Sequence, residues 1–169
     1  MTAKKKVLKL DDSFTEPEEI VLLITSTNKD YRMAYFLNKY LKFDFSRRSN
    51  LQYSTKLKEQ DTAEYPVFSC EAKEADLSWM LVSNKHSYGN LIKKTGNIDY
   101  LLIARGATEE VNVADMLAKI RKIPNVLFVN ETNLQAHANI FEVLEKLELL
   151  IILEEKRRKD QSQSYKDYN

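Results

Sequence analysis

The chain has 169 residues, which is the length of about one domain, and its 26 Lys and Arg nearly balance its 25 Asp and Glu. The net charge of +1 excludes a strongly cationic surface, so any nucleic-acid contact must come from a local patch. The single cysteine, Cys70, excludes an internal disulfide and a multi-thiolate metal site, and it favours a reducing, cytoplasmic compartment.

The ends of the chain carry no targeting pattern. The N-terminal lysines precede no apolar segment of the kind found in secretory signals, and apolar runs such as residues 149–153 are far shorter than the ~20 residues that span a bilayer. We therefore expect no membrane contact. The predicted organisation is a flexible segment (1–15), a single α/β domain (16–142), a C-terminal helical extension (143–158) and a disordered tail (159–169).

The first third of the chain predicts a strand, a helix and a weaker strand. Residues 19–24 are a short run of branched apolar side chains, which predicts a buried strand. Residues 30–41 repeat apolar side chains every three or four positions, which predicts a helix with Asp30 as its N-cap. Its buried face consists of Met33, Phe36, Leu37, Tyr40 and Leu41. Weak alternation in residues 43–54 predicts one strand, and the polar residues 55–65 predict a mobile loop.

The middle of the chain predicts a hairpin followed by a central strand. Residues 65–72 and 77–84 are strand-like and are joined by the four residues Lys-Glu-Ala-Asp, with Pro66 expected at the strand's beginning or on an edge. After a Lys-Thr-Gly-Asn turn, residues 98–105 are almost continuously apolar, which is typical of a strand that is covered on both faces.

The last third predicts a helix, a strand and a terminal helix. Residues 111–124 have helical periodicity, with Asn112 and Asp115 as a capping pair. Residues 125–131 predict a strand. Residues 135–156 contain neither Gly nor Pro, which favours a terminal helix, although the run Leu-Leu-Ile-Ile-Leu within them is also compatible with a final strand.

This order of elements predicts the fold class. Two strand-helix-strand units that flank a hairpin can form an α/β (α+β) sandwich, with a mixed β-sheet and helices packed mainly on one face, related to the ferredoxin-like arrangement. An open doubly wound α/β sheet is the alternative.

The residues that usually carry catalysis are scattered. None of the three glycines begins a phosphate-binding loop, and no nucleophile elbow of the Gly-x-Ser-x-Gly kind is present. His86 and His137 have no neighbouring ligand at metal-binding spacing, and Cys70 lies in a predicted strand without an adjacent base. We therefore predict no enzyme, no cofactor and no metal site.

Asp99 is the one acidic residue that directly precedes a buried strand. Gly96 supplies the positive φ of the preceding turn and Asn97 tolerates it. We expect Asp99 to accept hydrogen bonds from backbone amides of that turn or of a neighbouring loop, and Tyr100 to bury its ring while its hydroxyl finds a partner. The functional alternative places the Asp99 carboxylate at the mouth of a pocket.

The segment around Asp99, residues 92–100, resembles the signature of the IPExxxVDY family, small proteins of Bacteroidetes-type bacteria. The corresponding positions are Ile92, Ile98 in place of valine, Asp99 and Tyr100. Lys93 and Lys94 replace the proline and glutamate of the motif. The resemblance extends over about residues 19–142, so the remaining C-terminal segment is an added extension. It implies no activity, because the family has no established biochemical function.

The C-terminal segment motivates the leading functional hypothesis. Its apolar content exceeds what a helix covering one edge of a small core requires, which favours a non-catalytic binding or regulatory module that acts through protein contacts. Homodimerisation through this helix is the simplest form. The interface residues that we expect are Leu144, Leu147, Leu150 and Ile151. The alternative is that this helix only covers the sheet.

A local basic and aromatic patch motivates a second hypothesis, an RNA-binding accessory protein. Arg47 and Arg48 lie between Phe43, Phe45 and Tyr53 in the sequence. Aromatic rings can stack on bases while guanidinium groups contact phosphates. A small-molecule regulatory site is a third hypothesis, which rests on fold analogy alone.

Overall fold

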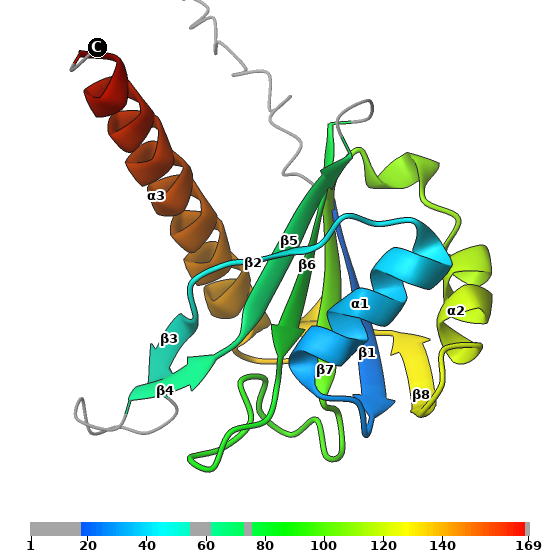
Figure 1. Cartoon of the computed structure of the whole chain (residues 1–169). Helices are drawn as coiled ribbons and strands as arrows, with labels where there is room; N and C mark the ends of the chain where they lie inside the picture. Colours follow the sequence, from blue (N-terminus) through cyan, green and yellow to red (C-terminus); the bar gives the residue numbers. More distant parts are fainter. Residues whose placement is uncertain (1–17, 55–61, 73–75, 168–169) are drawn as a thin grey trace, which may run out of the picture.

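A computed structural model of the chain describes residues 18–54, 62–72 and 76–167. The predicted flexible N-terminal segment and residues 55–61 of the predicted loop lie outside this described part. The described residues form an α+β fold with a six-stranded sheet, a two-stranded sheet and three α-helices (Figure 1). The predicted fold class is confirmed.

The large sheet has the strand order β2-β5-β6-β7-β1-β8, and every described strand pair in it is antiparallel. Its strands are β1 (Glu19–Ser26), β2 (Ser46–Arg47), β5 (Val67–Ala72), β6 (Leu77–Ser83), β7 (Tyr100–Gly106) and β8 (Val126–Glu131). Strands β5, β6 and β7 form a meander in which each connection reverses the chain direction, beginning with the predicted hairpin. The described pairs are therefore all antiparallel, whereas we expected a mixed sheet, with an open doubly wound sheet as the alternative.

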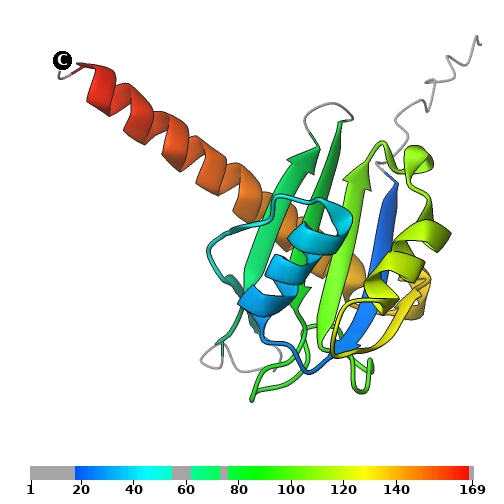
Figure 2. The ribbon, with the colours of Figure 1, turned by 45° about the vertical axis from the view of Figure 1, so that its right-hand side comes forward.

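Helices cover both faces of this sheet (Figures 1 and 2). The covering elements are α1 (Asp30–Leu41) and α2 (Val113–Arg121) on one face, and α3 (Ile140–Asp167) with the small sheet of β3 (Leu51–Ser54) and β4 (Thr62–Tyr65) on the other. Two of the three described α-helices thus share a face, as expected. The third lies opposite because the sheet has apolar side chains on both sides, and each side needs a covering layer.

Strand β7 shows how the two sides arise from one sequence. Its alternate residues point to opposite faces, so Leu102 lies in the core cluster under α1 and α2, while Leu101 and Ile103 lie in the cluster under α3. All three side chains are almost completely buried. The continuous apolar sequence of β7 therefore serves two cores at once, as the sequence predicted for this strand.

The two short helices begin differently. Asn112 caps α2, since its side chain accepts a 3.0 Å hydrogen bond from the Asp115 amide, which confirms that predicted cap. The N-cap of α1 is Lys29, which makes no side-chain capping bond, so the prediction of Asp30 as N-cap is wrong by one position. Asp30 is already helical, and its carboxylate accepts from the Tyr31 amide at the positive end of the helix dipole.

Two strands replace the single strand predicted between residues 43 and 54. β2 pairs with β5 at the edge of the large sheet, whereas β3 pairs with β4 in the small one. β4 lies inside the segment predicted to be a loop. Its alternation of exposed and buried residues is too short to stand out beside the polar residues before it, and its pairing with β3 decides the structure.

Helix α3 differs from its prediction at both ends. A short 3-10 turn (Leu134–Ala136) precedes it, and the helix itself begins at Ile140. It includes the Leu-Leu-Ile-Ile-Leu run and continues to Asp167, so the segment expected to be a disordered tail is helical up to that residue. The absence of Gly and Pro from residues 140–167 gives the helix no local reason to stop.

Two glycines give a matched test of the fold. Gly106 has φ +111°, and a Cβ built there would lie 2.1 Å from the Asp76 carbonyl oxygen, whereas Gly96 has φ +60° and no atom within 4 Å of its Cβ position. We expect Gly96→Ala to destabilise by about 1–2 kcal/mol through backbone strain alone, and Gly106→Ala by about 3 kcal/mol or more. Urea unfolding of both variants measures this. Equal losses would contradict the close approach of Gly106 to Asp76.

Candidate functional site

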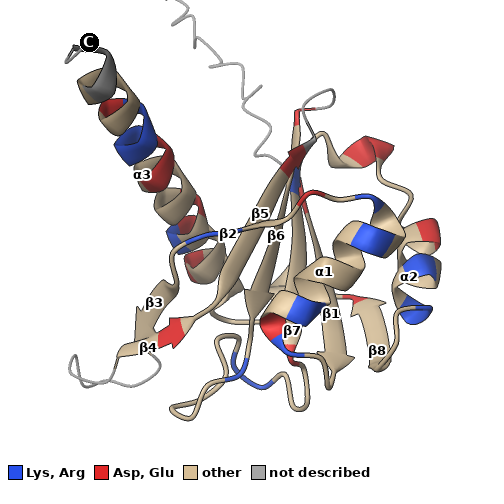
Figure 3. Ribbon diagram, in the orientation of Figure 1, with Lys and Arg blue, Asp and Glu red and all other residues tan. Residues whose placement is uncertain are grey.

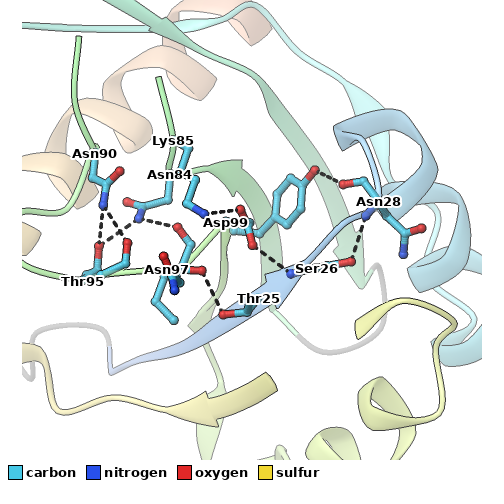
Figure 4. Close-up of polar contacts among 12 residues, drawn as sticks. Thr25, Ser26, Asn28, Asn84, Lys85, Asn90, Thr95, Asn97 and Asp99 are labelled. Atoms are coloured by element: carbon cyan, nitrogen blue, oxygen red, sulfur yellow. Dashed lines mark hydrogen bonds and ion pairs between the residues drawn. The ribbon is translucent and has the colours of Figure 1, made fainter. Parts of the chain in front are cut away.

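The Asp99 carboxylate joins the start of β7 to the end of β1 (Figure 4). Its Oδ2 accepts a 2.9 Å hydrogen bond from the Ser26 amide, and its Oδ1 lies 2.8 Å from the Lys85 ammonium. The Asp99 amide also donates to the Ile24 carbonyl at 2.8 Å. We expected the Asp99 carboxylate to accept from amides of the preceding turn or of a neighbouring loop. The amide that donates to it is that of Ser26, at the end of β1, and not one of the turn.

Asn84 organises the loop that precedes Asp99, and its role was not predicted. Its side chain is fully buried, donates to the Thr95 hydroxyl and to the Ile98 carbonyl at 2.9 Å each, and accepts from the Ile92 amide at 2.9 Å. One asparagine thus ties both ends of the motif segment together. Nothing in the local sequence marks it, because its partners lie 8 to 14 residues away.

The other motif residues also serve the framework. Tyr100 is buried, its hydroxyl donates to the Asn28 carbonyl, and burial raises the pKa of its phenol. Gly96 has φ +60°, as its place in the turn predicted. Ile92 and Ile98 belong to the core cluster under α3. The segment that resembles the family signature therefore positions strands and a loop.

A pocket of about 570 Å³ does lie beside Asp99, as the functional alternative predicted. Its polar lining includes Lys29, Lys85 and Asn28. Both carboxylate oxygens of Asp99 are engaged, one by the Ser26 amide and the other by the Lys85 ammonium. Among the described residues that line this pocket there is neither a cysteine nor a histidine.

The cysteine and the two histidines are also buried or hydrogen-bonded within the fold. Cys70 is buried, and burial raises the pKa of its thiol, which disfavours the reactive thiolate. His86 Nδ1 accepts a 3.1 Å hydrogen bond from the Tyr88 amide, and His137 Nε2 shares a 2.8 Å hydrogen bond with the Thr132 hydroxyl. In the part of the chain that the structure describes, no three His, Cys, Asp or Glu side chains are grouped to hold a metal ion.

The aromatic residues of the predicted RNA patch are not on one surface. Phe45 lies in the core cluster under α1 and α2, whereas Tyr53 lies in the cluster under α3. Phe43 packs on Trp79, with ring centroids 5.1 Å apart. The chain crosses from one side of the sheet to the other between Phe45 and Tyr53. The prediction that these rings form one stacking surface is therefore wrong.

The two arginines of that patch hold the chain crossing in place. Arg47 lies over the Phe68 ring at 5.2 Å and donates to the Val67 carbonyl at 2.9 Å. Arg48 is nearly buried and donates from Nε to the Ser69 hydroxyl at 2.5 Å. Its Nη1 is buried without a hydrogen bond and lies 3.9 Å from the carboxylate of Glu154 on α3. Both guanidinium groups thus contact neighbouring parts of the fold.

The inner face of α3 belongs to the core. Leu144 and Leu147 are 3% and 0% exposed, and Leu150 and Ile151 pack against the same cluster while remaining partly exposed. The prediction of these four residues as an intermolecular interface is wrong for the buried pair. Helical periodicity identified an apolar stripe, but α3 has a second one, and periodicity does not say which stripe meets the sheet.

The second apolar stripe of α3 faces outward. Leu149, Ile152 and Leu153 are 55%, 52% and 46% exposed. They lie about half a turn away from Leu147 on the same helix. The C-terminal part of α3 projects from the body (Figure 2). The sequence already shows more apolar residues in this helix than one buried face needs. Which of them are exposed could be decided only from the structure, which shows the stripe that packs on the sheet.

A contact near the middle of α3 fixes the direction in which it projects. The Glu154 carboxylate accepts a 2.6 Å hydrogen bond from the Ser49 amide and lies 3.9 Å from the Arg48 guanidinium. Burial raises the pKa of Glu154, but the Ser49 hydrogen bond and the Arg48 charge outweigh it and lower that pKa below the usual 4.5. The helix is therefore held to the body as far as Glu154.

An acidic groove of about 900 Å³ runs beside the first half of α3. Its acidic lining residues are Glu18, Glu19, Glu131, Glu142, Glu145 and Glu148. Arg105 is the one basic residue among the described lining residues, and it pairs with Glu19 at 3.3 Å and with Glu148 at 2.7 Å. The groove and the adjacent helix surface are thus strongly negative. Figure 3 shows the basic band farther along α3.

Comparison with protein-family models, with curated proteins and with solved structures found no significant match. Membership in the IPExxxVDY family therefore stays a prediction.

Among the described residues, no helix combines the length and the apolar character needed to cross a bilayer. The surface that stands out is the outward stripe of α3 beside the acidic groove.

The Glu154 contact predicts a pH-dependent stability. Because the folded-state pKa is lower than the unfolded one, this contact stabilises the fold above the unfolded-state pKa, and the stabilisation is lost as the pH falls through the folded-state pKa. We expect Glu154→Gln to destabilise by about 1 kcal/mol at pH 7 and the difference from wild type to shrink below about pH 4.5.

Urea unfolding at several pH values measures this difference. Glu109→Gln, at an exposed glutamate away from α3, is the matched control and should change stability by less than about 0.5 kcal/mol at pH 7. A Glu154→Gln effect that is the same at pH 7 and pH 3 would contradict the assigned contact.

Proposed function

We propose that this chain is a non-catalytic binding module that acts through protein contacts made by the outer face of α3. The observation that carries the proposal is the exposure of Leu149, Ile152 and Leu153 on a helix whose other face is fixed in the core. A helix that is apolar on two faces meets a second apolar surface in the usual helix-mediated contacts of proteins.

The energies favour this use of the stripe. Full burial of one leucine or isoleucine side chain stabilises by roughly 1.5–3 kcal/mol, and α3 offers three such side chains about half exposed. Their contacts, with matching side chains on a partner, are on the scale of the 4–15 kcal/mol that association costs in lost freedom. The helix is already ordered to the end of this stripe by its Glu154 contact, so little further ordering is needed.

The state of the reactive groups supports the non-catalytic part of the proposal. The Asp99 carboxylate is engaged by Ser26 and Lys85, and the Cys70 thiol is buried with a raised pKa. Each histidine is also hydrogen-bonded within the fold. A general base or nucleophile needs a partner that activates it beside a site for substrate, and these groups instead fasten loops and strands.

A capture experiment tests the proposal. Full-length protein immobilised through an N-terminal tag is exposed to a lysate of the source organism, in parallel with the double variant Leu149→Gln/Ile152→Gln. We expect the wild type to retain at least one protein, including further copies of the chain, that the double variant loses, because two apolar contacts at the centre of the stripe are removed.

Leu127→Gln is the matched control, since Leu127 is 70% exposed but lies on β8, away from α3. This variant should capture the same proteins as wild type. Both variants change exposed side chains and should keep the unfolding midpoint of wild type at concentrations where wild type is monomeric. Identical capture by wild type and by the double variant would contradict a binding role for this face.

A further inference from the structure

The outward stripe of α3 has a charge pattern that reverses along the helix. Exposed residues recur at alternating steps of three and four positions, which keeps them on one face. In order they are Glu142, Glu145, Leu149, Ile152, Lys156 and Lys159. Two acidic residues thus precede the apolar centre and two basic residues follow it.

This order is complementary to itself when it is read in the opposite direction. An antiparallel copy aligned about the midpoint between Leu149 and Ile152 places Leu149 against Ile152 of the second copy. The same alignment places Glu145 against Lys156 of the second copy, and Glu142 against its Lys159. Each ion pair occurs twice, because a two-fold axis repeats every contact.

Resting on the proposed function, we propose that the partner of the outer face of α3 is a second copy of this chain, and that the two α3 helices pair antiparallel about this axis. A parallel pair would set Glu145 against Glu145 and Lys156 against Lys156, and like charges in facing positions are destabilising. The observed charge order therefore selects the antiparallel arrangement.

The acidic groove strengthens this choice of partner. Arg105 pairs with Glu19 and Glu148, and Lys146 lies 3.9 Å from Glu142. The described lining contains six glutamates, so it remains negative after these two cations are counted. The antiparallel register brings the basic residues 156–159 of the second copy alongside this half of α3. The negative groove of one copy and the basic band of the other attract each other in this two-fold antiparallel arrangement.

The shape of the molecule leaves room for the pairing. The sheet lies on the inner side of α3, where Val143, Leu144 and Leu147 are buried. The proposed contact uses the exposed side, where Ile152 also borders a pocket of about 240 Å³ beside the sheet. α3 projects from the body beyond the region of Glu154 (Figures 1 and 2). Two copies that meet by their outer faces therefore hold their sheets on opposite sides of the helix pair.

Charge reversal with sedimentation equilibrium tests this arrangement on the full chain. We expect wild type to dimerise, and Glu142→Lys/Glu145→Lys and Lys156→Glu/Lys159→Glu each to raise the dimer dissociation constant at least about tenfold. A mixture of these two variants should form a one-to-one complex, because every pair is then opposite in charge. The variant that carries all four changes should regain the homodimer.

Glu142 also accepts a 2.9 Å hydrogen bond from the Tyr53 hydroxyl, so a second set restricted to Glu145→Lys and Lys156→Glu leaves that contact intact. It should show the same weakening and the same rescue on mixing. Unfolding midpoints equal to that of wild type, measured at a concentration where wild type is monomeric, show that each variant is folded.

Two results would overturn the inference in different ways. A wild-type chain that stays monomeric at about 100 μM would show that the dimer dissociation constant is weaker than this concentration, and it would exclude a second copy as the partner. Stripe-dependent capture of another protein would then leave the proposed function standing. A dimer that dissociates with Leu149→Gln/Ile152→Gln but ignores the charge reversals would overturn the antiparallel register alone.

Discussion

The packing of the inner stripe of α3 on the second face of the sheet is the contact on which the rest of the structure depends. β7 sends Leu101 and Ile103 to that face, and without Val143 and Leu147 of α3 these side chains would meet water. α3 is therefore part of the core and not an appendage to a finished domain. A binding role for this helix has to use its outer face, because the inner one is already occupied.

Polar contacts fix the geometry that the core leaves undetermined. Asn84 closes the loop before β7, and Asp99 fastens the entrance of β7 to the end of β1. Glu154, held by Ser49 and Arg48, sets where α3 stops following the body. Side chains that elsewhere perform chemistry are used here to hold loops, strands and a helix. The surface that remains available is apolar at its centre and charged at its two ends.

The elements with strong periodicity could be predicted from the sequence, and those that depend on partners could not. β7 and the Asn112 cap of α2 follow from local patterns. β4 does not, because its few alternating residues gain meaning only from pairing with β3. The interface was placed on the wrong stripe of α3 for a related reason: Leu147 and Leu149 are both apolar, and only the position of the sheet distinguishes the buried one from the exposed one.

The central claim is that one helix gives its inner face to the core and its outer face to a partner. Hydrogen exchange of α3 at low and high protein concentration tests it most directly. The claim predicts that amides of residues 143–151 are protected as strongly as those of β7 at both concentrations, and that residues 152–160 gain protection as concentration rises. Exchange of residues 143–151 as rapid as that of the end of α3 would contradict it.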